Sequence, residues 1–366
     1  MTKPTRSWMT GLGLKTVATL LLSTLLISCG SSKKYDEFMP TRILSIGDAV
    51  SYMDLRSARA PNFANALTVS DSNINFSTVH DHWLRGFAAS YGLTKIGAPG
   101  STGTNVIAYN SRTDSGGSEP VSSANPRNLG TIDDVRAQAN LLTASDDGDL
   151  VVVSIGMGDI FKRADELALT NALTTSDDVT AKDIGLQYAN LADSLYQRGF
   201  KHVLIVTALD FSLSPYAYAR SQVAATSNYS ANIAALTEAL NKGVNVNCNG
   251  GCTLGESKPY PSRNAGVWKY NAYDLLRNVT LGTSPYLVAN INSTQPVCAT
   301  GFQTCSAKAS DNFLNLNPAY LIAGSTTSSL YDSNKYFFAG DLFPTPVVHQ
   351  FMGANMYAYT RGFSGF

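Results

Sequence analysis

A near-continuous apolar run at residues 150–155 constrains the fold of this chain more than any other stretch. A strand that lacks polar alternation is buried on both faces, and such strands belong to parallel sheets covered by helices. Similar runs occur at residues 43–46 and 203–206. Because helical segments separate these strands, we predict an α/β three-layer sandwich with a central parallel sheet flanked by helices.

Helices are predicted where apolar residues recur at helical spacing and capping residues mark the ends. Thr131 and Asp134 resemble a capping box that opens one helix, and Thr180 and Asp183 resemble one that opens a longer helix. Further helices are expected at residues 83–91, from residue 229 to a stop at Gly243, and at residues 346–359. Residues 56–80 and 109–130 are rich in small polar residues and are predicted to be loops.

Residues 1–28 are typical of a secretory signal, with three cations and an apolar run at residues 17–27 that is too short to span a bilayer. The residues Leu26-Ile27-Ser28-Cys29 resemble a bacterial lipobox, in which the cysteine is acylated. Ordinary signal cleavage with an incidental Cys29 is the alternative. The residues directly after Cys29 are Gly30 and Ser31, without the aspartate that usually marks inner-membrane retention. The resemblance therefore implies an acyl anchor in the outer membrane of a bacterial cell envelope, with the face of that membrane left open.

Beyond the signal, residues 29–41 are predicted to be a tether and residues 42–366 a single domain, since no linker long enough to separate two domains is found. Without residues 1–28 the chain has 24 basic and 27 acidic residues, a net charge of −3. A slightly acidic surface disfavours nucleic acid as a partner.

Four cysteines follow Cys29, an even number that suggests two disulfides in an exported protein. Their close spacings favour Cys248–Cys252 and Cys298–Cys305 among the three connectivities. A metal cluster is the rival interpretation, but the neutral, glycine-rich surroundings disfavour it. The first pair falls in residues 244–265, which we expect to be an excursion attached to the sheet.

The first predicted strand ends in Gly47 and Asp48, at the carboxyl edge of the sheet, where ligands bind in parallel α/β proteins. Many hydrolases place a nucleophilic hydroxyl in such a strand-to-helix turn. The residue after Asp48 is Ala49, which has no nucleophilic atom. This turn is therefore built like an active-site turn without its reactive group.

Four short motifs follow one another along residues 42–362: Ile46-Gly47-Asp48-Ala49, Gly97-Ala98-Pro99-Gly100-Ser101, Ser154-Ile155-Gly156-Met157-Gly158-Asp159, and residues 338–345 with a trailing His349. Their order and spacing resemble the SGNH or GDSL hydrolase superfamily, and within it the secreted esterase, phospholipase and haemolysin branch. Four motifs in the right order are a specific signal, although each one alone is weak.

In that family a Ser nucleophile, a His base, an Asp that orients the base, and Gly and Asn oxyanion donors act together. The resemblance puts the nucleophile at Ala49, the two donors at Gly100 and Gly158, the orienting acid at Asp341 and the base at Phe343. Loss of the nucleophile or the base alone costs about four to six orders of magnitude in rate. The resemblance therefore predicts a pseudoenzyme that uses no cofactor and acts by binding a lipid, acyl or glycan ligand or an envelope protein.

Two other functions stay open at this point. The first is an esterase or lipase that uses Ser51 as its nucleophile with His349 as the base, and the second is a structural scaffold in the outer membrane. If the chain is a pseudoenzyme, we expect the ring of Phe343 to lie over Ala49 and Gly158, because an emptied catalytic notch would forfeit contact energy.

Several other side chains have an expected role. Asp48 and Asp159 are expected to brace turns. His80 and His82 have the spacing of a metal pair, but without a third ligand we interpret them as a solvated loop pair. Four aromatic residues are candidates for a cleft wall or for the core: Phe211, Tyr216, Tyr218 and Tyr229.

Overall fold

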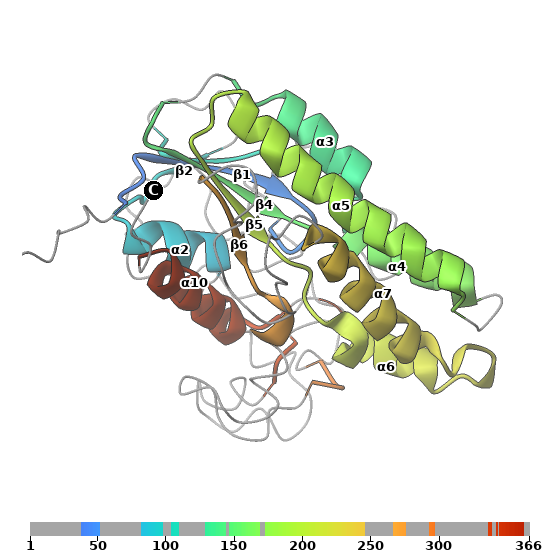
Figure 1. Cartoon of the computed structure of the whole chain (residues 1–366). Helices are drawn as coiled ribbons and strands as arrows, with labels where there is room; N and C mark the ends of the chain where they lie inside the picture. Colours follow the sequence, from blue (N-terminus) through green and yellow to red (C-terminus); the bar gives the residue numbers. More distant parts are fainter. Residues whose placement is uncertain are drawn as a thin grey trace, which may run out of the picture.

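The computed structural model describes residues 38–51, 82–97, 104–109, 129–143, 146–168, 173–245, 266–275, 293–296, 336–338, 342 and 344–361. Within these ranges the chain forms a six-stranded sheet in which every pairing is parallel (Figure 1). The strand order is β2-β3-β1-β4-β5-β6. The strands are β1 (Arg42–Gly47), β2 (Ile96–Gly97), β3 (Val106–Ala108), β4 (Asp149–Ser154), β5 (His202–Val206) and β6 (Val267–Tyr270). The predicted α/β class and its parallel sheet are confirmed.

Helices lie on both sides of this sheet (Figure 1). On one side are α2 (Trp83–Ser90) and α10 (Pro346–Arg361), which pack against each other. On the other are α3 (Ile132–Asn140), α5 (Thr175–Gln197) and α7 (Tyr229–Val244). Helices α4 (Met157–Ala168) and α6 (Pro215–Ser221) pack on α7, and two 3₁₀ turns, Phe211–Leu213 and Ala224–Thr226, flank α6.

The strands are buried as their apolar sequences require. Every residue of β4 and of β5 is buried, and β1 is buried from its second residue onward. The first residues of β1 and β4 are joined by an ion pair in which Asp149 is fully buried and Arg42 is partly exposed. Before β1, the ring of Phe38 packs on His202 with a centroid distance of 4.1 Å, so chain within the predicted tether already contacts the sheet.

Two predicted helix ends are wrong. Helix α5 begins at Thr175, with Thr174 and Asp177 forming its capping box, whereas the hydroxyl of Thr180 donates to a carbonyl inside the helix. Gly243 does not end α7, which runs one residue further to Val244. A glycine is needed there because a Cβ atom would stand 1.9 Å from the carbonyl oxygen of Lys182 in α5. The capping box of Thr131 and Asp134, by contrast, is present at the start of α3.

The strand order sets the place where a ligand site is expected. After β1 the chain adds β2 and β3 on one side of it, and then β4, β5 and β6 on the other. The order therefore reverses between β1 and β4, and in open parallel sheets ligands bind at the carboxyl ends of the strands at such a point. In the described part of the chain, no helix combines the length and the apolar character that crossing a membrane requires.

Candidate functional site

The turn after β1 lies at this reversal point and is built on a glycine. Gly47 has a φ of +143°, and a Cβ atom on it would stand 2.4 Å from the carbonyl oxygen of Ser154 at the end of β4. A side chain at this position would therefore push the two central strands apart. The amide of Gly47 donates to the Gln138 side chain at 2.7 Å, which ties the turn to α3.

Asp48 joins the turn to the ends of the next elements. Its buried carboxylate accepts hydrogen bonds from the Val50 amide (3.1 Å), the Ser154 hydroxyl (2.6 Å) and the Met157 amide that opens α4 (3.0 Å). Burial raises the pKa of Asp48, and the three donors oppose that shift. The expectation that Asp48 braces a turn is confirmed, because all three bonds hold backbone or neighbouring strand ends in place.

Ala49 and Gly158 are both covered by the dipeptide that precedes α3. The amide of Ala49 donates to the carbonyl oxygen of Leu129 at 2.9 Å, and Ala49 is buried. A Cβ atom on Gly158 would stand 2.3 Å from the carbonyl oxygen of Gly130. Backbone therefore occupies the space that an asparagine at position 158 would need. We refer to residues 47–51, 129–130 and 156–159 together as the sealed turn.

Leu129 is wholly buried, which corrects the prediction of a surface loop at residues 109–130. Gly130 has a φ of +82°, and a Cβ atom on it would stand 3.0 Å from the Cα of Asp48. A glycine at this position lets the chain adopt a left-handed conformation while touching the turn. In the sequence this was one glycine among many small residues.

Asp159, in the first turn of α4, also stabilises the sealed turn, because it ties α4 to the start of α3 and to α5. Its carboxylate accepts from the Ile132 amide at 3.2 and 3.1 Å and from the Tyr188 hydroxyl at 2.7 Å. Burial raises the pKa of Asp159 to about 6, and the Tyr188 hydrogen bond opposes the shift. The bracing role expected of Asp159 is confirmed.

Ser51 and His349 are both buried and engaged elsewhere. The Ser51 hydroxyl donates to the carbonyl oxygen of Asp48 at 3.0 Å. His349 accepts from the Trp83 amide through Nδ1 at 3.4 Å, and burial lowers the pKa of its ring to about 3. Its Nε2 has no hydrogen-bond partner in the part of the chain that the structure describes.

The solvated-loop interpretation of His82 is wrong. His82 is fully buried, caps α2 by accepting from the Leu84 amide, and stacks on His349 with ring centroids 4.9 Å apart. Its Nε2 contacts the carbonyl oxygen of Val50 at 3.2 Å. The imidazole pair therefore joins the turn after β1 to α2 and α10, and burial lowers the pKa of His82 well below its usual value.

Several predicted site residues lie outside the described ranges. Among the five residues that the resemblance assigns to catalytic positions, these are Gly100, Asp341 and Phe343, so the expected position of the Phe343 ring over Ala49 stays a prediction. The same holds for the acylation site and the cysteines of the two disulfides: Cys29, Cys248, Cys252, Cys298 and Cys305.

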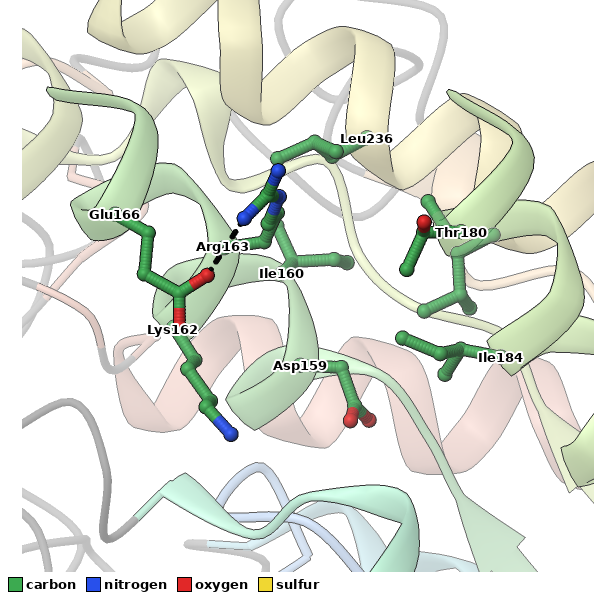
Figure 2. A pocket seen from close by; sticks show the side chains of 10 residues that line it. Asp159, Ile160, Lys162, Arg163, Glu166, Thr180, Ile184 and Leu236 are labelled. Carbon is green, nitrogen blue, oxygen red and sulfur yellow. Dashed lines mark hydrogen bonds and ion pairs between the residues drawn. The ribbon is translucent and has the colours of Figure 1, made fainter. Parts of the chain in front are cut away.

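A groove that the sequence did not reveal lies beside the sealed turn, between α4, α5 and α7 (Figure 2). Its volume is about 280 Å³. It is lined by Asp159, Ile160, Lys162, Arg163, Glu166, Thr180, Ala181, Ile184, Leu236 and Leu240. Five of these residues lie on one face of α4. The apolar spacing in residues 157–168 does not predict a helix, so the sequence gives no indication of this groove.

The aromatic residues near residue 216 mostly belong to the core. Phe211, Tyr216 and Tyr229 are buried and contact one another or Phe161 edge to face or at a tilt. Only Tyr218 among the four candidates is well exposed, at 44%. These rings therefore do not form a common cleft wall in the described chain.

A scan against protein-family models and a search of curated proteins find no match to this chain.

Proposed function

We propose that this chain is a catalytically inactive relative of the SGNH or GDSL hydrolases, held at the outer membrane through an acylated Cys29, and that it acts by binding. The observation that carries the proposal is the sealed turn. At the reversal point of a parallel sheet, where a substrate would need to enter, Leu129 and Gly130 contact the positions of Ala49 and Gly158.

The chemistry of that turn supports the absence of acyl transfer. Position 49 has no hydroxyl to attack a carbonyl, and its amide, a candidate oxyanion donor, is already bonded to Leu129. Losing an oxyanion donor costs about two to three orders of magnitude even when the rest of a site is intact. Position 158 has no donor side chain and no room for one. The ligand classes proposed for the protein remain those of the family, namely lipid, acyl or glycan groups, or an envelope protein.

The geometry gives less support to the esterase that uses Ser51 and His349. A serine nucleophile needs its hydroxyl proton directed to a base, whereas the Ser51 hydroxyl donates to Asp48 and the Nδ1 of His349 accepts from Trp83. A scaffold role has no specific observation in its favour.

Hydrolysis of p-nitrophenyl butyrate and p-nitrophenyl octanoate by the full chain tests the proposal. We expect a rate no higher than that of buffer, and the same result for the double variant Ala49→Ser with Phe343→His, because Gly130 still covers the site. Turnover by the wild type that disappears in both Ser51→Ala and His349→Ala would overturn the proposal and establish the esterase.

A further inference from the structure

The groove between α4, α5 and α7 exists because these helices contact one another at a few points and stand apart between them. A Cβ atom on Gly185 would stand 1.9 Å from the carbonyl oxygen of Leu240, so α5 and α7 approach closely at that point. Helix α4 is tied to α5 at two other points. Asp159 accepts from Tyr188, and Arg163 donates through Nε to Asp177 at 2.8 Å. Between these two ties α5 presents the small side chain of Ala181, and space remains.

The wall of the groove is mainly apolar. Most of the charged side chains that line it already have partners within the protein. Arg163 is paired with both Glu166 and Asp177. Asp159 is only 8% exposed and already accepts from an amide and a hydroxyl. Lys162 is exposed and makes no ion pair or hydrogen bond with any residue in the described ranges. Of the lining charges in these ranges, the ammonium of Lys162 is therefore the one that no other described residue pairs with.

We propose that this groove binds a small amphipathic carboxylate, with the acyl chain on the apolar wall and the carboxylate at Lys162. The wall is formed by Ile160, Ala181, Ile184, Leu236 and Leu240. The proposal rests on the proposed function in that it gives the binding protein a ligand class, but it places the ligand beside the sealed turn and not in it.

The volume of the groove is large enough for an acyl chain of medium length. At about 30 Å³ per water molecule, 280 Å³ corresponds to roughly nine waters. Octanoate, with ten non-hydrogen atoms, is of that size. A ligand with about ten non-hydrogen atoms is expected to bind weakly, with a Kd on the order of 1 mM.

Octanoate titrated against the full chain, followed by saturation-transfer NMR, tests the proposal. Ile184→Trp fills the groove and is expected to weaken binding at least tenfold, whereas Val179→Trp, on an exposed part of the same helix, leaves it unchanged. Lys162→Glu is expected to weaken octanoate binding at least threefold without changing the binding of uncharged methyl octanoate. Lys182→Glu, on exposed α5 surface outside the groove, is the matched control.

Equal binding by Ile184→Trp and Val179→Trp would overturn the groove as the site, and equal binding by Lys162→Glu and Lys182→Glu would overturn the carboxylate as the ligand. Thr180→Trp, at an exposed lining position, replaces Ile184→Trp if that variant does not fold. The outcome is separate from the proposed function, because ester hydrolysis by the wild type would end the latter whatever octanoate does.

Discussion

The sealed turn and the groove lie on two sides of the first turns of α4, and they are built in opposite ways. On one side Gly158 meets the backbone of Gly130 with no room for a single added carbon. On the other, Ile160 faces a cavity of about 280 Å³. Main chain therefore covers the described part of the sheet edge that carries Ala49 and Gly158, whereas the open volume lies between α4, α5 and α7, on the other side of Asp159. If the protein binds a ligand near α4, the groove has the space for it.

The change that most directly breaks this comparison is Gly158→Asn, which would restore the donor that the family resemblance assigns to this position. Its Cβ would stand 2.3 Å from the Gly130 carbonyl oxygen and 2.4 Å from its carbon, so the two segments must separate. We expect a loss of at least about 4 kcal/mol in the free energy of unfolding, or a chain that does not fold.

Urea denaturation measures this loss, with Lys162→Asn on the exposed face of the same helix as the control. A cost below about 1 kcal/mol for Gly158→Asn would mean that residues 129–130 do not cover the position.

Asp48→Ala tests whether the carboxylate holds the sealed turn together. The substitution leaves the amides of Val50 and Met157 and the hydroxyl of Ser154 buried without their acceptor. At about 1 to 3 kcal/mol for each unsatisfied donor, with some relaxation, we expect a loss of about 4 kcal/mol. Asp48→Asn keeps an acceptor oxygen and should cost clearly less. Equal losses for the two variants would contradict the bracing role.

Asp159 belongs to both regions, because it braces the sealed turn and lines the groove. Its pKa is about 6 in the folded protein and 3.8 in the reference state, so between these values the folded chain binds more protons than the unfolded chain. The contribution of the Asp159 carboxyl to the free energy of unfolding is therefore fully present below about pH 4 and is lost as the pH rises through about 6. At about 1.4 kcal/mol per pKa unit, the loss is about 3 kcal/mol.

The measurement is the free energy of unfolding of the wild type minus that of Asp159→Asn, from pH 4 to pH 8. His349, whose lowered pKa makes stability fall in the acid direction, is present in both proteins and cancels in the difference. A difference that does not change with pH would show that the Asp159 carboxyl is as well solvated folded as unfolded.

The smallest change in stability is expected for a substitution that lines the groove. Ala181→Val adds two methyl groups where space exists, so the free energy of unfolding should change by less than about 1 kcal/mol, including the lower helix propensity of valine. Ala189→Val, at a wholly buried position of the same helix, should cost about 1 to 3 kcal/mol. Thermal unfolding of the two variants compares them, and equal losses would mean that the groove is closed in solution.

The sequence predicted the sheet well because burial on both faces leaves a strong pattern. The strands at residues 43–46, 150–155 and 203–206 are all present within one residue of their predicted ends. Helix ends were harder where two signals competed. Thr174 with Asp177 and Thr180 with Asp183 both fit a capping box, and the ion pair of Asp177 with Arg163, distant in sequence, accompanies the first. Helix α4 was missed because Gly-Met-Gly-Asp resembles a loop.

The site was predictable only in part. The motif order placed Ala49 and Gly158 in one region, and the sheet register brings Gly47 and Ser154 side by side just before them. The cover by Leu129 and Gly130 depends on a left-handed glycine meeting another glycine across the fold, which no local pattern encodes. The groove depends on how far apart three helices stand, and that distance is set by glycines and ion pairs between them.

We propose that the turn after β1 is structural and that its one hydroxyl, on Ser51, is not an activated nucleophile. Intact mass measurement of the full chain after incubation with a fluorophosphonate, which bonds covalently to activated serines with loss of fluoride, tests it most directly. We expect an unmodified mass. A stoichiometric adduct on Ser51 that is absent in His349→Ala would contradict it.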